Sequence, residues 1–206
     1  MRIYNVHIHT ITNQALPKNF LPFGLVRLLA KKKFTKRLAK LFNNLNPFSN
    51  NDILDRYAKF LTIGNLGSQE KIFNYITRFY PAKTVFCVLS VDLAYMNAGK
   101  VKQDYHDQLL ELVELKKKYN DKILPFICVD PRRPGITELA IEFLEKHSFH
   151  GIKLYPALGY FPNDERLSKL YSYAEKKGVP IVAHCSKDGA YYKGKLDNSI
   201  FSEFEK

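Results

Sequence analysis

Two histidines stand one residue apart near the start of the chain, in the stretch YNVHIHT at residues 4–10. Because the side chains of a strand alternate between its two faces, His7 and His9 should point to the same side, with Cα atoms roughly 6.5 Å apart. Imidazole nitrogens are common ligands of zinc-class ions. The pattern therefore indicates either part of a metal site or two polar residues that fall in a strand.

A third histidine, His184, ends a later apolar run, VPIVAHCS at residues 179–186. A catalytic zinc site usually has three protein ligands and an open position, where the ion lowers the pKa of water to near neutral. Three histidines at strand ends favour this interpretation over ordinary core histidines, and we expect a divalent metal, zinc, on His7, His9 and His184. The remaining histidines lack this placement: His106, His147 and His150.

Short apolar runs rich in Val, Ile and Phe are typical of strands buried on both faces of a parallel sheet. Such runs predict five strands, at residues 2–9, 83–92, 122–130, 150–156 and 179–186. Helical spacing of apolar residues predicts intervening helices at residues 104–120, 135–147 and 164–178. Repeated βα units predict an α/β fold with a parallel sheet or a (β/α) barrel, in which functional residues collect at the carboxyl ends of the strands.

Five stretches together resemble the amidohydrolase superfamily, and specifically the amidohydrolase-related family that also contains metal-dependent decarboxylases. In chain order they are VHIHT, VDLAYMNAGKV, LPFICVDPRRPG, GIKLYPALGYFPND and VPIVAHCS. The resemblance implies that the first-strand pair and the fifth-strand histidine bind the metal, which places the ligands at His7, His9 and His184. It implies a metal-dependent hydrolase in which a metal-activated water attacks an amide, ester or lactone carbon of a small molecule.

Two alternatives stay open beside hydrolysis. One is decarboxylation of a carboxylated substrate on the same metal scaffold. The other is a non-catalytic half barrel that acts as a binding module. No Gly-x-Gly-x-x-Gly follows the first strand and no Walker loop occurs, so the sequence gives no support to a nucleotide site.

Barrels of the resembled family have eight strands, with a further histidine on the sixth and an aspartate on the eighth. A complete barrel takes about 250 residues, whereas this chain has 206 and its fifth predicted strand ends near residue 186. We therefore expect one domain, residues 1–206, that forms an incomplete TIM-type barrel of about five βα units. Its two open edges favour poor solubility or association into a homo-oligomer.

Lys153, in the fourth predicted strand, is the candidate catalytic residue. In some relatives, the resemblance implies, a lysine at this place reacts with carbon dioxide and the carbamate bridges two metals. An unmodified Lys153 would instead hold a substrate carboxylate, or form an ion pair with Asp92 or Asp130. These two aspartates end strands, where they either support the histidines or shape the loops that follow.

Loops at the same rim hold further candidates for contact with an acidic or aromatic substrate: Arg132, Arg133, Tyr95, Tyr155 and Tyr160. Polar residues at such a rim are usually only solvated. Cys185 follows His184 directly, so alternation turns its side chain away from the metal and we do not expect it to be a ligand.

The composition is that of a globular protein, with 46% hydrophobic and 25% charged residues. Three cysteines in apolar runs do not suggest a disulfide framework, and no apolar run is long enough for a membrane span. We expect a cytoplasmic location. The net charge of +12 is concentrated in the first 51 residues, which hold nine basic residues and no acidic ones.

Much of this charge falls in an expected helical insertion after the first strand, at residues 11–65. Apolar residues recur at roughly helical spacing in residues 23–42, with basic residues between them. Such a segment could bind an anionic membrane or nucleic acid, but solvated charge runs are much commoner. We therefore expect a basic cover over the barrel and no nucleic-acid partner.

Overall fold

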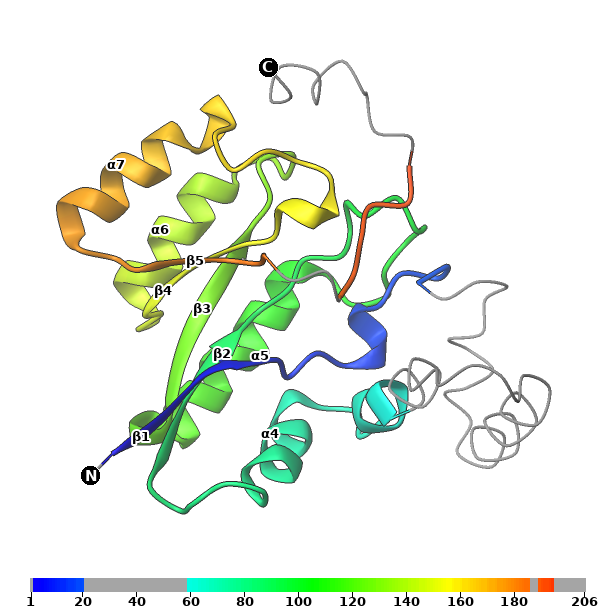
Figure 1. Ribbon diagram of the computed structural model, residues 1–206, viewed down its shortest axis with the longest axis vertical. Helices are drawn as coiled ribbons and strands as arrows, with labels where there is room; N and C mark the ends of the chain where they lie inside the picture. The colour runs from blue at the N-terminus through cyan, green and yellow to red at the C-terminus, as the bar shows by residue number, and fades with distance from the viewer. Residues whose placement is uncertain (1, 21–58, 186–188, 195–206) are drawn as a thin grey trace.

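The computed structural model describes residues 2–20, 59–185 and 189–194, and its five parallel strands form one sheet in sequence order (Figure 1). They are β1 (Ile3–Ile8), β2 (Thr84–Leu89), β3 (Ile123–Val129), β4 (Gly151–Leu154) and β5 (Ile181–Ala183). Each strand lies within the range predicted for it. The sheet curls as consecutive units of a barrel do, which confirms the predicted fold class, an incomplete TIM-type (β/α) barrel.

Helices connect the strands, and those after β2 follow one another along the outer face of the sheet (Figure 1). They are α4 (Gln69–Thr77), α5 (Tyr105–Lys118), α6 (Ile136–Lys146) and α7 (Ser168–Lys177). Ser68 and Asp104 cap α4 and α5 by accepting hydrogen bonds from Lys71 N and His106 N, whereas Gly178 ends α7 with φ 65°. The 3₁₀ helices are η1 (Asn13–Ala15), η3 (Asn120–Lys122), η4 (Pro156–Leu158) and η5 (Glu165–Leu167).

Alternation along the strands divides the apolar residues into two clusters. The larger lies between sheet and helices and includes Val88, Ile127 and Ile152, all fully buried. The smaller lies on the inner face and consists of Cys87, Leu89 and Phe126, with Leu124 and Val182 packed against it. Gly151 is required here, because a Cβ on it would lie 2.2 Å from Cε1 of Phe126. The inner cluster is the apolar floor below the carboxyl ends of the strands.

The outer face of β1 is only partly covered by helices. By alternation Tyr4, Val6 and Ile8 should all face helices. Ile8 is buried, but Tyr4 and Val6 are 53% and 66% exposed. These side chains form an apolar strip along one edge of the sheet.

The ends of the expected insertion are part of the core. Leu16 and Leu61 are buried in the outer cluster, and Asn13 donates a hydrogen bond from Nδ2 to the carbonyl of Leu61, at 2.8 Å. The basic stretch, residues 23–42, lies outside the described residues, as does its expected role. Among the helices described, each falls short of the length and apolar character that crossing a membrane requires.

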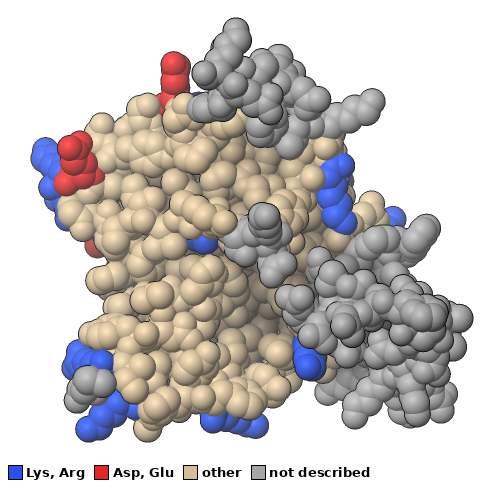
Figure 2. Space-filling view, viewed as in Figure 1, with Lys and Arg blue, Asp and Glu red and all other residues tan. Residues whose placement is uncertain are grey.

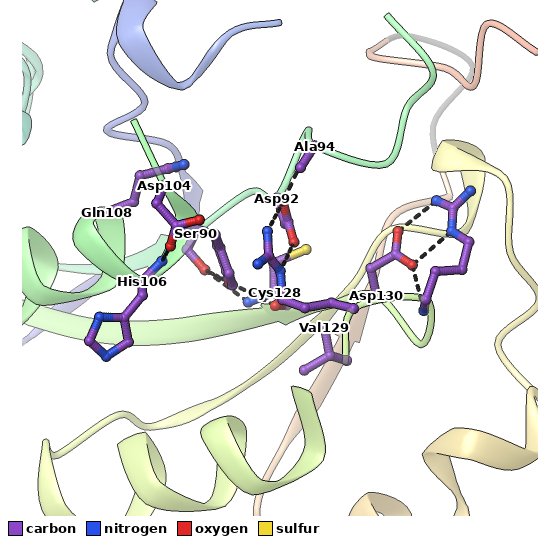
Figure 3. Close-up of polar contacts among 12 residues, drawn as sticks. Ser90, Asp92, Ala94, Asp104, His106, Gln108, Cys128, Val129 and Asp130 are labelled. Carbon is purple, nitrogen blue, oxygen red and sulfur yellow. Dashed lines mark hydrogen bonds and ion pairs between the residues drawn. The ribbon is translucent and has the colours of Figure 1, made fainter. Parts of the chain in front are cut away.

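Two buried ion pairs hold the loops that follow β2 and β3 (Figure 3). Asp130 accepts from Nε and Nη2 of Arg132 at 2.8 and 2.6 Å, and Asp92 accepts from the same atoms of Arg133 at 2.6 and 3.1 Å. Both carboxylates are 1% exposed. Bidentate pairing offsets the cost of burying these charges and fixes the path of each loop.

The pair Asp164–Arg166 repeats the geometry of Asp130–Arg132 atom for atom, with matching distances of 2.8 and 2.6 Å, but Arg166 is 58% exposed and Arg132 22%. Arg132→Met should lower the free energy of unfolding by about 3–5 kcal/mol, because it leaves a buried carboxylate without its partner. Arg166→Met should cost at most about 1 kcal/mol. Urea titration of both variants checks this, and equal losses would contradict it.

Candidate metal centre

The strand β1 is irregular where its histidines lie. Its register against β2 runs from Asn5, opposite Phe86, to Ile8, opposite Val88, so β1 carries one extra residue between these points. The amide of His7 donates to Oδ1 of Asn5, at 3.0 Å, in place of a regular ladder bond. This bulge sits next to the site and helps to aim both imidazoles.

The two imidazoles lie together as predicted, with their Nε2 atoms 3.0 Å apart. Nδ1 of His9 lies 2.7 Å from the carbonyl oxygen of Leu89, the last residue of β2. A carbonyl oxygen only accepts, so Nδ1 of His9 must carry the proton, which leaves its Nε2 as an acceptor. The neighbouring strand thus sets the tautomer in which Nε2 can bind a metal.

Electrostatics favour the neutral form of both rings. Burial lowers the pKa of His9 to about 4, and the charges of His7, Lys153 and His184 act in the same direction. Burial also lowers the pKa of His7, with further lowering by Lys153 and then His184. Neutral imidazole is the form that binds metals, so the pair is ready for a cation at neutral pH.

His184 follows β5 at the same rim, and its amide donates to the carbonyl of Leu154, at 3.0 Å. Its ring packs on that of Tyr155, with centroids 4.2 Å apart. It is close enough to His7 and His9 to lower their pKa values. In the part of the chain that the structure describes, however, three or more His, Cys, Asp or Glu residues nowhere form a group able to hold a metal. The structure therefore brings two of the three predicted ligands together.

After β5 the chain returns across the rim. The amide of Ala190 donates to the Tyr155 hydroxyl at 2.8 Å, and that of Tyr192 donates to the carbonyl of Ala157 at 2.8 Å. A Cβ on Gly189 would lie 2.3 Å from the Tyr155 hydroxyl oxygen and 3.1 Å from Nε2 of His184. Only glycine lets the backbone pass this close to the outer ring nitrogen of His184.

Lys153 points from β4 to the inner face and is fully buried. In contrast, the charged side chains visible on the surface lie mostly around the margin of the face in Figure 2. Its Nζ has no hydrogen-bond partner among the described residues. Burial lowers the pKa of Lys153. The ion pair that we considered with Asp92 or Asp130 is wrong, because each aspartate is paired with an arginine.

The rim tyrosines and arginines are structural to a greater degree than expected. Tyr95 lies between the two guanidinium groups, 5.6 Å from that of Arg132 and 5.4 Å from that of Arg133. Tyr160 is buried and donates to the carbonyl of Val129 at 2.8 Å. The expectation that such residues are merely solvated fails here, since ion pairs, cation–π contacts and burial hold them. Sequence spacing alone did not indicate these pairings.

A group of hydrogen bonds that the sequence did not indicate links the end of β2 to β3 below the rim. The hydroxyl of Tyr105 lies 2.8 Å from Oγ of Ser90 and donates to the carbonyl of Cys128 at 2.7 Å, while the amide of Cys128 donates to Ser90 (Figure 3).

Cys185, which we did not count as a ligand, is exposed, and its thiol lies 3.7 Å from the carbonyl of Ala183.

The curled parallel sheet and the His-x-His pair at a strand end together define an incomplete (β/α) barrel with paired imidazoles at its carboxyl rim. A family model described as Amidohydrolase matches residues 86–202. This match covers more than half of the chain, and the chain belongs to the amidohydrolase family. The matched range includes Lys153 and His184, and it begins after His7 and His9. A comparison with curated proteins found no match.

The buried amine of Lys153 generates a prediction about stability. Lys153→Met removes a buried amine that has no hydrogen-bond partner among the described residues and keeps the length of the side chain, so the free energy of unfolding should rise by about 1–3 kcal/mol. Lys116→Met is the matched control, because Nζ of Lys116 donates to the carbonyls of Asn120 and Ile123. That variant should be destabilised. Urea titration decides, and a less stable Lys153→Met variant would show that Lys153 supports the fold.

The pKa of His9 generates a second prediction. Between about pH 6.5 and pH 4 the unfolded chain binds a proton at His9 and the folded chain does not, so acidification favours unfolding. In metal-free protein this loss should reach about 3 kcal/mol near pH 4. Unfolding titrations at several pH values should show a smaller loss in His9→Gln, which has no such proton to bind. Parallel profiles for the two proteins would contradict the prediction.

Proposed function

We propose that this chain carries the histidine part of the metal centre of a hydrolase that cleaves an amide, ester or lactone of a small molecule. The contact between His7 and His9 is the observation that supports it most. Two Nε2 atoms 3.0 Å apart need either a hydrogen on Nε2 of His7, which its neutral tautomer can supply, or a metal ion bound by both rings, since Nε2 of His9 is an acceptor. Membership of the amidohydrolase family favours the metal.

Zinc suits these nitrogens. Tetrahedral zinc with nitrogen ligands at about 2.0–2.1 Å places two such nitrogens about 3.3 Å apart, so the pair needs to separate only slightly. His7 and His9 would hold the ion, and His184 is the third ligand that we propose. A divalent metal here would supply a Lewis acid that polarises a carbonyl and lowers the pKa of water.

The chain's own groups would orient the ligand histidines and bind the substrate. The carbonyl of Leu89 holds the ring of His9, and the inner apolar cluster below keeps water from the floor of the site. Lys153 is buried without a hydrogen-bond partner among the described residues, and its Nζ has only a cation–π contact with Tyr155, at 5.7 Å from the ring centroid. Burying an amine without hydrogen bonds is costly unless a ligand is to be bound. We propose that Lys153 binds a carboxylate of the substrate as an ammonium, and its carbamate is the alternative that the family suggests.

Lys153 also supports a second candidate, decarboxylation. A bound carboxylate next to the metal pair could be the group that leaves, in place of an acyl group attacked by water. The two reactions differ in product, because only decarboxylation releases carbon dioxide. A non-catalytic module, our other alternative, would need neither the histidine pair nor an unpaired buried lysine.

Metal binding tests the proposed centre. The purified full chain, freed of metal and dialysed against zinc, should take up one ion with an affinity that falls sharply in His7→Ala and His184→Ala. His150→Ala is the matched control, since His150 lies at the opposite end of β4, where its amide donates to Pro125 O. That variant should bind zinc normally. Elemental analysis measures the stoichiometry, and unchanged zinc content in both ligand variants would remove the assignment.

Zinc-loaded protein can then be tested with carboxylated and uncarboxylated esters, amides and lactones. Acid release without carbon dioxide supports hydrolysis, whereas carbon dioxide release supports the second candidate. A carbamate carbon signal after labelling with ¹³C-bicarbonate, lost in Lys153→Met, would replace the proposed carboxylate contact with the carbamate.

A further inference from the structure

The ladder of β1 ends where the candidate ligands lie. Its last paired residue is Ile8, opposite Val88, and the bulge precedes it. His9 and Thr10 therefore extend past the regular strand and depend on other bonds for their position. The ring of His9 is fixed by the carbonyl of Leu89. The backbone that carries this ring continues directly into Thr10.

Gln69, the first residue of α4, holds Thr10. Oγ1 of Thr10 donates to Oε1 of Gln69 at 2.7 Å, and Nε2 of Gln69 donates to the carbonyl of Gln108 in α5 at 2.6 Å. The amide of Gln69 donates to Oε1 of Glu111 at 2.8 Å. Gln69 and Thr10 are 7% and 4% exposed. Both ends of the carboxamide are thus used, and the residue after His9 is tied to two helices.

A parallel connection lies beside it. Oγ1 of Thr12 donates to Oε1 of Gln103 at 3.3 Å, and Nε2 of Gln103 donates to Oε2 of Glu111 at 3.2 Å. These bonds are longer, and Thr12 is further from the histidines in the chain. The cavity between the two connections has a volume of about 10 Å³, roughly enough for one water molecule. Thr10 therefore has little room to move while Gln69 is in place.

We propose that Gln69 is a positioning residue for the His7–His9 pair, acting through its buried hydrogen bond with Thr10. By holding Thr10, Gln69 keeps the His9 ring where Nδ1 meets Leu89 and Nε2 faces His7. A buried hydrogen-bonded amide fixes one geometry more strictly than an apolar contact would, because a shift leaves polar groups without partners. The inference rests on the proposed metal centre for its functional consequence.

Four single variants of the full chain test the proposal. Thr10→Val and Gln69→Met remove the bond with little change of shape, whereas Thr10→Ser keeps the hydroxyl. Thr12→Val makes the same chemical change at a buried threonine of the parallel connection. Cobalt(II) serves as the probe, because its absorption bands report ligand geometry. Thr10→Val and Gln69→Met should bind cobalt about tenfold more weakly than wild type and shift its bands. Thr10→Ser and Thr12→Val should match wild type in both.

A second readout needs no metal. The ¹⁵N shifts of the His9 ring should report the Nδ1–H tautomer in wild type, Thr10→Ser and Thr12→Val, and a mixture of tautomers in Thr10→Val. If wild type binds cobalt and Thr10→Val behaves like Thr12→Val, the role of Gln69 is overturned and the metal centre stands. If wild type binds no cobalt, the metal centre fails, and the ¹⁵N shifts alone decide: an unchanged His9 spectrum in Thr10→Val overturns the positioning role, and a changed one supports it.

Discussion

Parallel pairing of five strands in sequence order is the constraint on which the site depends. Each strand sends alternate side chains inward, so Lys153 in β4 and three histidines lie on one face of the sheet. His7 belongs to β1, and His9 and His184 directly follow β1 and β5. Below them the same alternation places the inner apolar cluster. A shift of one residue in any strand would exchange these polar groups for the apolar side chains of the outer layer.

The polar side chains at the carboxyl end of the sheet differ in their hydrogen-bond partners. The strand-end carboxylates Asp92 and Asp130 are neutralised by arginines from the loop after β3. The ring of His9 is held by one carbonyl. The Nζ of Lys153 is buried without a hydrogen-bond partner among the described residues and has a cation–π contact with the Tyr155 ring, at 5.7 Å. Hydrogen bonds satisfy the carboxylates of the loops but not the amine of Lys153, which is the pattern expected where a ligand completes the site.

Much of this fold follows from local sequence patterns. Runs such as KTVFCVLSVD predict buried parallel strands, and His7 and His9 were expected on one face because alternation needs no tertiary information. Helix α4 was missed, although Ser68 followed by Ile72, Phe73 and Ile76 is a capped amphipathic pattern. The bulge in β1 was not predictable, because it arises from pairing with β2. The partners of Asp92 and Asp130 depend on the paths of the loops, which the sequence does not specify. The sequence therefore could not show that these aspartates pair with arginines and not with Lys153.

We propose that His7 and His9 are metal ligands. X-ray absorption spectroscopy of the zinc-loaded full chain tests it most directly, because the spectrum reports the ligand atoms themselves. If His7 and His9 hold the ion, the spectrum should show nitrogen or oxygen neighbours at about 2.0–2.1 Å, with outer-shell scattering from at least two imidazole rings that is lost in His7→Ala. Zinc surrounded only by water oxygens, or by sulfur at about 2.3 Å, would contradict it.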